Sequence, residues 1–132
     1  MERTYSTPLL DKLGVRPGSR VALIRIGDDA IRDLLAERTS DVTEGPPMPE
    51  TDLVLLGADS PAELADLDAL RTRIRPNGAI WVVSRKGRLA TLRDVKVIAA
   101  ARAAGLINNK VASFSATHTA LRLVIPVASR PR

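Results

Sequence analysis

The 132-residue sequence contains no cysteine and a single histidine, His118. Without cysteine there are no disulfides, no thiolate metal ligands and no cysteine nucleophile. One imidazole also leaves no second histidine to complete a metal site. We therefore expect no metal centre, and we expect His118 to lie exposed in a hairpin turn.

Aromatic residues make up 2% of the chain, with one tryptophan, one tyrosine and one phenylalanine. Trp81 lies in an apolar run, which favours a place in the core over a role as a stacking platform. No run is long enough to predict a membrane-spanning helix, and the first residues lack the apolar centre of a signal peptide. A cytoplasmic protein is the expectation from these absences.

Charge is distributed unevenly along the chain, which has a net charge of +5. Residues 1–83 carry 10 basic and 14 acidic side chains, whereas residues 84–132 carry 10 basic and 1 acidic. Such an asymmetry indicates either an anionic partner or a solvated basic face. A nucleic-acid partner would be contacted by the cations of the second half: Arg88, Arg93, Lys96, Arg102 and Lys110.

Short apolar runs alternate with amphipathic stretches that begin at capping residues or proline and end at glycine. In chain order, the expected elements are helix 9–13, strand 20–26, helix 30–38, a proline-rich loop 39–50, strand 53–57, a helix from Ser60 to Ile74, strand 79–84, a basic loop 85–90, helix 91–104, a hairpin 110–127 and a frayed tail 129–132.

Two of these helices have further signals. Ser60-Pro61-Ala62-Glu63 is typical of a capping box, and Leu64, Leu67, Leu70 and Ile74 follow it at helical spacing. In helix 91–104, the spacing of Leu92, Val95 and Ile98 predicts the buried stripe.

This alternation predicts a single α/β domain over residues 1–132, with residues 1–18 forming an N-terminal helix and turn. The architecture we expect is a small three-layer Rossmann-like sandwich, in which a mostly parallel sheet is closed by a C-terminal antiparallel hairpin.

The stretch 13–20 and the strand after it resemble the start of a class I methyltransferase, as do residues 52–56, residues 74–83 and the closing strand pair. That resemblance implies a further strand within 39–50 that ends in the acid for the cofactor's ribose, and Asp41-Val42 is its only trace. The turn Gly27-Asp28-Asp29 keeps one glycine, although glycines are what let backbone approach a cofactor. We expect no cofactor and no tight binding of S-adenosylmethionine.

A second resemblance spans most of the chain and concerns a short bacterial family, domain of unknown function 3052. The similar segments are Tyr5-Ser6-Thr7-Pro8-Leu9, Lys12-Leu13-Gly14-Val15, Pro17-Gly18, Val21-Ala22-Leu23, 52–56, Gly78-Ala79-Ile80-Trp81-Val82, Ala104-Gly105-Leu106 with Lys110-Val111, and Leu121-Arg122-Leu123-Val124. The chain departs from the family at Ser84-Arg85-Lys86, where the family has Pro-Lys-Lys, and at Thr117-His118-Thr119-Ala120, where it has Thr-Trp-Ser-Gly. The resemblance implies a fold and a size but no mechanism.

Ligands of open α/β sheets bind outside the carboxyl ends of the strands. The residues expected there are Gly27, Asp28, Gly57, Ser60, Arg85 and Lys86. The two cations would neutralise a small anion, while the same acids and serine also suit plain helix caps.

The sequence contains no catalytic constellation. The function we expect is therefore a non-catalytic Rossmann-like module that binds a partner protein or a small anionic ligand. A nucleic-acid-associated basic protein is the alternative, and a degenerate methyltransferase is a weaker one.

Overall fold

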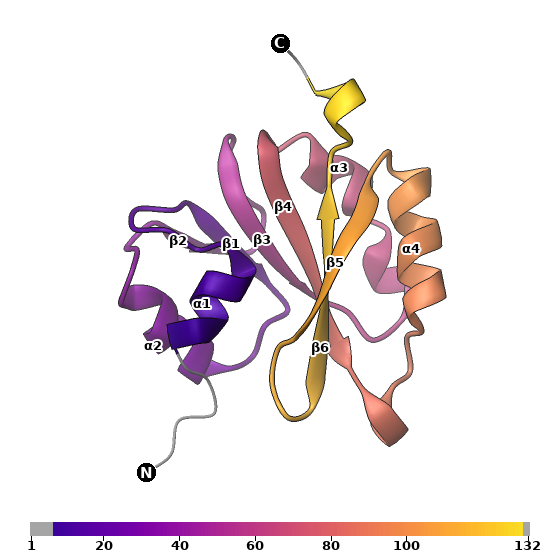
Figure 1. Cartoon of the computed structure of the whole chain (residues 1–132), viewed down its shortest axis with the longest axis horizontal. Helices are drawn as coiled ribbons and strands as arrows, with labels where there is room; N and C mark the ends of the chain where they lie inside the picture. Colours follow the sequence, from indigo (N-terminus) through magenta and orange to yellow (C-terminus); the bar gives the residue numbers. More distant parts are fainter. Residues whose placement is uncertain (1–6, 131–132) are drawn as a thin grey trace.

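A computed structural model of the chain describes residues 7–130 as a six-stranded sheet covered by helices on both faces (Figure 1). The strands are β1 (Val21–Ile24), β2 (Val42–Glu44), β3 (Thr51–Gly57), β4 (Ile74–Arg85), β5 (Ile107–Ser113) and β6 (His118–Val124). The helices are α1 (Thr7–Leu13), α2 (Asp29–Ala36), α3 (Leu67–Arg71) and α4 (Asp94–Ala103), with 3₁₀ turns η1 (Pro61–Leu64), η2 (Gly87–Leu89) and η3 (Val127–Ser129).

The strand order is β2-β1-β3-β4-β6-β5. The first four strands in that order run parallel, and the β5–β6 hairpin joins β4 in antiparallel pairing. The predicted fold class is confirmed: an α/β sandwich whose mostly parallel sheet ends in an antiparallel hairpin.

Two hydrophobic clusters occupy the two faces of the sheet. One packs α1 and α2 against a face that includes Trp81, and the other packs η1, α3 and α4 against the opposite face. Trp81 is fully buried, as predicted, and its indole nitrogen donates to the carbonyl of Leu13 over 3.0 Å. That bond fixes the end of α1 over the middle of the sheet.

The predicted proline-rich loop 39–50 contains the short strand β2, which begins at Val42, within the Asp41-Val42 trace of the strand that the methyltransferase resemblance implies. Its neighbour β1 supplies the pairing: the Val21 amide donates to Asp41 and the Gly45 amide donates to Leu23. Prolines flank only the end of this strand, and three residues are too few to form a visible pattern.

The predicted helix from Ser60 to Ile74 is divided into η1 and α3, and Ile74 begins β4. In α4 the buried residues are Val97 and Ala101, whereas Val95, expected inside, is 65% exposed. The first helix is interrupted where the Glu63 carbonyl accepts from Arg25, and the stripe of α4 was misplaced because Leu92, though buried, precedes the helix.

Three smaller predictions also need correction. His118 is the first residue of β6 and not part of the turn, and the basic loop 85–90 contains η2. In the predicted tail, Ser129 belongs to η3 and Arg130 bonds the Ile125 carbonyl, while 131–132 lie outside the described residues. Among residues 7–130, no helix has the length and apolarity needed to cross a membrane.

Candidate functional site

The carboxyl ends of β1, β3 and β4 meet the β5–β6 turn around a cavity of about 290 Å³, which we call the crevice. It is lined by Arg25, Ile26, Gly27, Asp28, Gly57, Ala58, Asp59, Glu63, Val83, Phe114 and His118. This is where the rule for open α/β sheets places a ligand.

The chain makes an unusual turn as it leaves β1. Arg25 has a φ of 54°, a left-handed conformation that a residue with a side chain adopts only when its surroundings enforce it. Asp28 then caps α2, because its carboxylate accepts from the Ala30 amide over 2.8 Å. The capping role expected for Asp28 is thus present.

Gly57, at the end of β3, is required by a close backbone approach. A Cβ atom there would lie 2.2 Å from the carbonyl oxygen of Arg25, far inside van der Waals contact. The ends of β1 and β3 therefore sit closer together than any other residue type would allow.

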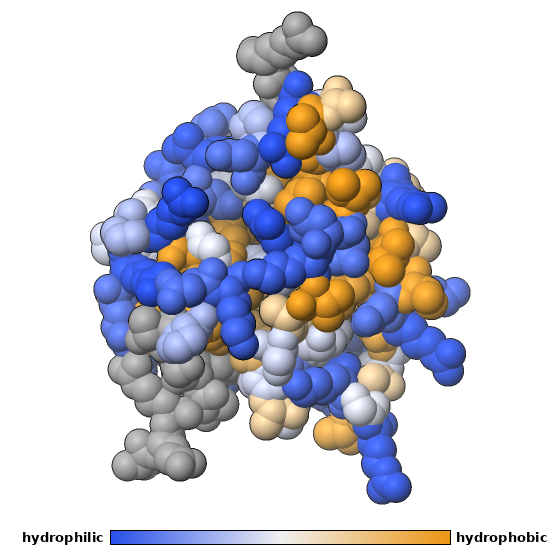
Figure 2. Space-filling view, in the orientation of Figure 1, coloured by the Kyte–Doolittle hydropathy of each residue, from blue (hydrophilic) through white to orange (hydrophobic). Residues whose placement is uncertain are grey.

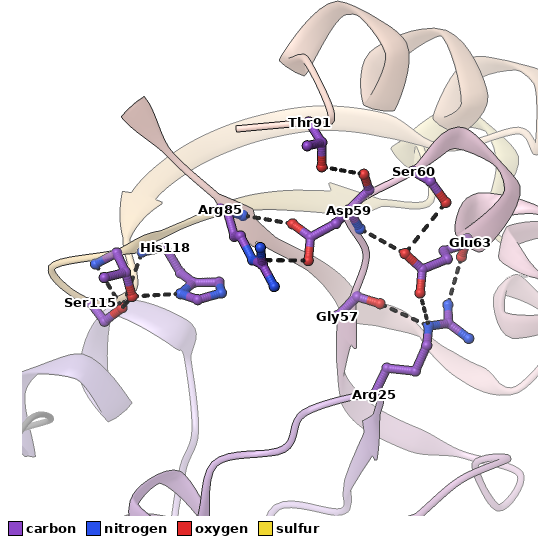
Figure 3. Close-up of polar contacts among 10 residues, drawn as sticks. Arg25, Gly57, Asp59, Ser60, Glu63, Arg85, Thr91, Ser115 and His118 are labelled. Atoms are coloured by element: carbon purple, nitrogen blue, oxygen red, sulfur yellow. Dashed lines mark hydrogen bonds and ion pairs between the residues drawn. The ribbon is translucent and has the colours of Figure 1, made fainter. Parts of the chain in front are cut away.

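The side chain of Arg25 then bridges the two strand ends (Figure 3). Its Nε donates to the Gly57 carbonyl over 3.0 Å and lies 3.1 Å from a carboxylate oxygen of Glu63, while Nη2 donates to the Glu63 carbonyl over 2.7 Å. The other oxygen of that carboxylate accepts from the Asp59 amide over 2.9 Å. We call this arrangement the Arg25–Glu63 bridge.

Asp59 connects the bridge to the next strand (Figure 3). Its carboxylate accepts from the Arg85 amide over 3.0 Å and lies 3.7 Å from Arg85 Nε. Its carbonyl accepts from the Thr91 hydroxyl over 2.6 Å, which ties the loop before α4 to the end of β3. Both acids of this network therefore have cationic partners within the protein.

The hairpin closes the remaining side of the crevice. Phe114 is buried there, and His118 is half-buried opposite Arg85 in the β4–β6 pairing. The His118 amide donates to the Ser115 hydroxyl over 3.1 Å, and its Nδ1 lies 2.8 Å from the Thr117 hydroxyl. His118 consequently presents a fixed ring with Nε2 as its remaining polar atom.

The six residues expected at the site do not form one surface. Gly27, Asp28 and Gly57 line the crevice, whereas Ser60 lies beside it with its hydroxyl 3.4 Å from Glu63. Arg85 and Lys86 line a separate shallow hollow of about 470 Å³, next to Arg93 and the start of α4. Lys86 also donates to the Ser113 hydroxyl over 2.9 Å.

Four polar residues of the crevice were not among the six expected site residues: Arg25, Asp59, Glu63 and His118. Arg25 follows β1 directly and Asp59 lies in the expected strand end 57–60, two residues after β3, so their position was an available signal. Glu63 was interpreted only as part of a helix cap, and the bridging partner of its carboxylate is distant in sequence.

An acid also stands at the end of β2, a residue that the sequence did not identify. Glu44 receives hydrogen bonds from both Nε and Nη2 of Arg32, with the Nε bond at 2.8 Å. The hydrogen bond to Glu44 is the main cause that raises the pKa of Arg32 above its usual value. Glu44 is therefore held in an ion pair and does not face the crevice as a free carboxylate.

Within residues 7–130, no group of three or more acidic, histidine or cysteine side chains is placed to hold a metal ion.

Several methyltransferases of known structure are similar to this chain. A methyltransferase from Aquifex aeolicus matches with a TM-score of 0.67 at 11% identity, over 93% of this chain and 91% of that one. Magnesium protoporphyrin IX methyltransferase from Synechocystis PCC 6803 matches at 0.65 and 12% identity, over 89% and 75%. Precorrin-6y C5,15-methyltransferase from Geobacter metallireducens matches at 0.63 and 13%, over 93% and 90%.

The chain thus has the Rossmann-like fold of the class I methyltransferases, and identities this low show the fold alone. No protein-family model matches the chain, and no curated protein sequence matches it either.

Proposed function

We propose that the protein is a non-catalytic module with a methyltransferase-like fold, which binds a small polar ligand or a partner protein at the crevice. The observation that carries this proposal is the Arg25–Glu63 bridge. It lies across the carboxyl ends of β1 and β3, where a cofactor of this fold would need open backbone.

Two further features fit S-adenosylmethionine poorly. Asp28 and Asp29 follow Gly27 in place of further glycines, and the Asp28 carboxylate is engaged in capping α2. The acid at the end of β2, Glu44, is paired with Arg32. We therefore assign no methyl-transfer step to these residues. A degenerate methyltransferase is the weaker alternative function.

The crevice favours a small polar ligand over the anion expected from the sequence. Arg85 and Lys86, the cations meant to hold that anion, lie outside the crevice lining. The lining carries Arg25 as its one cation against the carboxylates of Asp28, Asp59 and Glu63, and this balance disfavours an anion. At about 290 Å³ the cavity is at the lower end of ligand pockets, which start at about 300 Å³.

We also propose that the chain belongs to the bacterial family called domain of unknown function 3052. We propose a cytoplasmic location as well. The support for membership is the run of similar segments from Lys12 to Val124. Segments shared in that order are compatible with the fold, but they assign no ligand.

A calorimetric titration with S-adenosylmethionine tests the non-catalytic assignment directly. We expect no binding at micromolar concentrations, and micromolar affinity would overturn the assignment. A thermal-shift screen with nucleotides, amino acids and short RNA then searches for the ligand, because a molecule that binds only the folded state raises the melting temperature.

The variant Gly27→Val tests whether a ligand found in this screen binds in the crevice. A Cβ atom at Gly27 meets no atom within 4 Å, so we expect valine to narrow the crevice while the fold is kept. We expect it to abolish the shift given by a crevice ligand, while Ser40→Val on an exposed bend leaves the shift intact. Equal shifts in both variants would place the ligand elsewhere.

A further inference from the structure

A second hollow lies at the opposite end of the sheet, where the parallel strands begin. We call it the amino-end pocket; it measures about 390 Å³ and is lined in part by Arg16, Ser19, Asp52, Asn77 and Arg122. The segment between α1 and β1 forms one wall, and β3, β4 and β6 form the other. Nothing in the proposed function uses this end of the molecule.

Two arginines of this pocket lack acidic partners. Arg20, Arg25, Arg32, Arg38, Arg75 and Arg85 all have a carboxylate within 4.0 Å. Within residues 7–130, neither Arg16 nor Arg122 forms an ion pair or a side-chain hydrogen bond. Arg71, Arg73, Arg88, Arg93, Arg102 and Arg130 also form no ion pair among the described residues, so what distinguishes Arg16 and Arg122 is that both line one pocket.

A third cation increases the positive charge beside them. Lys110 of β5 lies directly opposite Arg122 of β6, and like charges at such paired positions repel. The Lys110 ammonium is 3.5 Å from the carbonyl of Lys12, close to the last turn of α1. Figure 2 shows hydrophilic side chains across the middle of this face, over α1 and the hairpin.

The single carboxylate of the pocket does not neutralise this charge. One oxygen of Asp52 lies 2.9 Å from Arg75 Nε, and the other accepts from the Arg20 amide over 2.8 Å. Asp52 is thus occupied by residues other than Arg16 and Arg122.

We propose that the amino-end pocket binds the phosphate group of a small phosphate monoester. Guanidinium groups match phosphate oxygens with two parallel hydrogen bonds, and Arg16 and Arg122 reach the pocket from different segments. A phosphate close to a dianion would offset more of the positive charge of Arg16, Arg122 and Lys110 than a single carboxylate would. Asn77 supplies an uncharged polar group beside them.

A small molecule fits this pocket better than a nucleic-acid strand. The pocket is a concave hollow with two unpaired arginines, and no aromatic side chain lines it. Single-strand binding relies on exposed rings on which the bases stack, and the only tryptophan is fully buried.

The test is a calorimetric titration of the full chain with inorganic phosphate and with ribose 5-phosphate, in a phosphate-free buffer. We expect saturable binding of both probes that weakens at least about tenfold in R16Q/R122Q, since two charge-assisted contacts are lost. The matched control is R88Q/R102Q, which removes the same charge from exposed positions outside the pocket and should alter affinity less than about twofold.

Each alternative has its own result. If both double variants lose the same phosphate affinity, the effect comes from overall charge and the proposal is overturned. The proposal is also overturned if the unmodified chain shows no saturable phosphate binding. Steeply salt-dependent binding of a short RNA that ribose 5-phosphate does not displace would assign the cations to nucleic acid instead. Circular dichroism checks folding, and R16Q alone, in an exposed turn, repeats the test if the double variant is unstable.

Discussion

At the carboxyl end of the parallel strands, the charged side chains of the crevice are bonded within the protein: Arg25 to Glu63, Asp59 to Arg85 and Asp28 to the start of α2. At the amino end, Arg16 and Arg122 have no acidic partner among residues 7–130. At the end where this fold ordinarily binds a ligand, the charged groups are therefore paired within the protein, while unbalanced charge remains at the other end.

The comparison shows that a chain can keep a fold while the residues at the usual binding site of that fold bond to one another. The strand ends still meet where the topology demands, but the side chains there now hold the strands together. Two guanidinium groups without an acidic partner in one pocket, Arg16 and Arg122, indicate where an anion could be held.

The largest effect we expect comes from Gly57→Ala, which tests how closely the ends of β1 and β3 approach each other. Its Cβ would lie 2.2 Å from the Arg25 carbonyl oxygen, so the backbone of β1 or β3 must move. The free energy of unfolding should fall by about 3 kcal/mol in urea denaturation. Gly27→Ala, with no atom within 4 Å, is the control and should change it by less than about 0.5 kcal/mol. Similar losses in both would contradict the close approach.

Trp81→Phe tests the anchor beneath the amino end. The substitution leaves the Leu13 carbonyl without its 3.0 Å hydrogen bond and opens a void in a fully buried position. We expect a loss of about 2 kcal/mol in the free energy of unfolding. Unfolding is monitored by circular dichroism, because the substitution removes the only tryptophan of the sequence. Leu89→Ala, at a residue that is 63% exposed, should cost almost nothing. A negligible loss in Trp81→Phe would mean that α1 is held by its apolar contacts alone.

Glu63→Gln weakens the bridge while keeping its shape. The carboxylate contacts Arg25 at 3.1 Å and the Asp59 amide at 2.9 Å, but both side chains are partly exposed. We expect about 1 kcal/mol less stability, with the difference shrinking in high salt. Glu50→Gln, on an exposed glutamate between β2 and β3, is the matched control. A loss of the same size in the control would show that only net charge matters.

The smallest effect is expected from Arg122→Gln in the absence of phosphate. Removing the charge opposite Lys110 should raise the free energy of unfolding by about 0.3 kcal/mol. Lys110→Gln should give a similar gain, and the double variant should gain no more than either single change, because one repulsion is removed in each case. Additive gains in thermal unfolding would show that the two cations do not interact.

Much of the fold could be predicted because its signals are local. The apolar run Leu53-Val54-Leu55-Leu56 predicted the buried strand β3, and the amphipathic stretch 30–38 predicted α2. The strand β2 left only the trace Asp41-Val42 in the sequence, because its hydrogen bonds come from β1, about 20 residues earlier in the chain. The helix from Ser60 was predicted too long because Arg25 takes the Glu63 carbonyl that a continuing helix would use.

The sequence by itself determined the class of fold, the burial of Trp81 and the absence of thiolate chemistry, since these depend on composition and on spacing along one segment. Tertiary structure decided which charges pair. Arg25 and Glu63, 38 positions apart, meet only because β1 and β3 are neighbours in the sheet. Arg16 and Arg122 line one pocket only because the segment after α1 passes the end of β6. Such pairings depend on distances between strands, and the order of residues along the chain does not specify them.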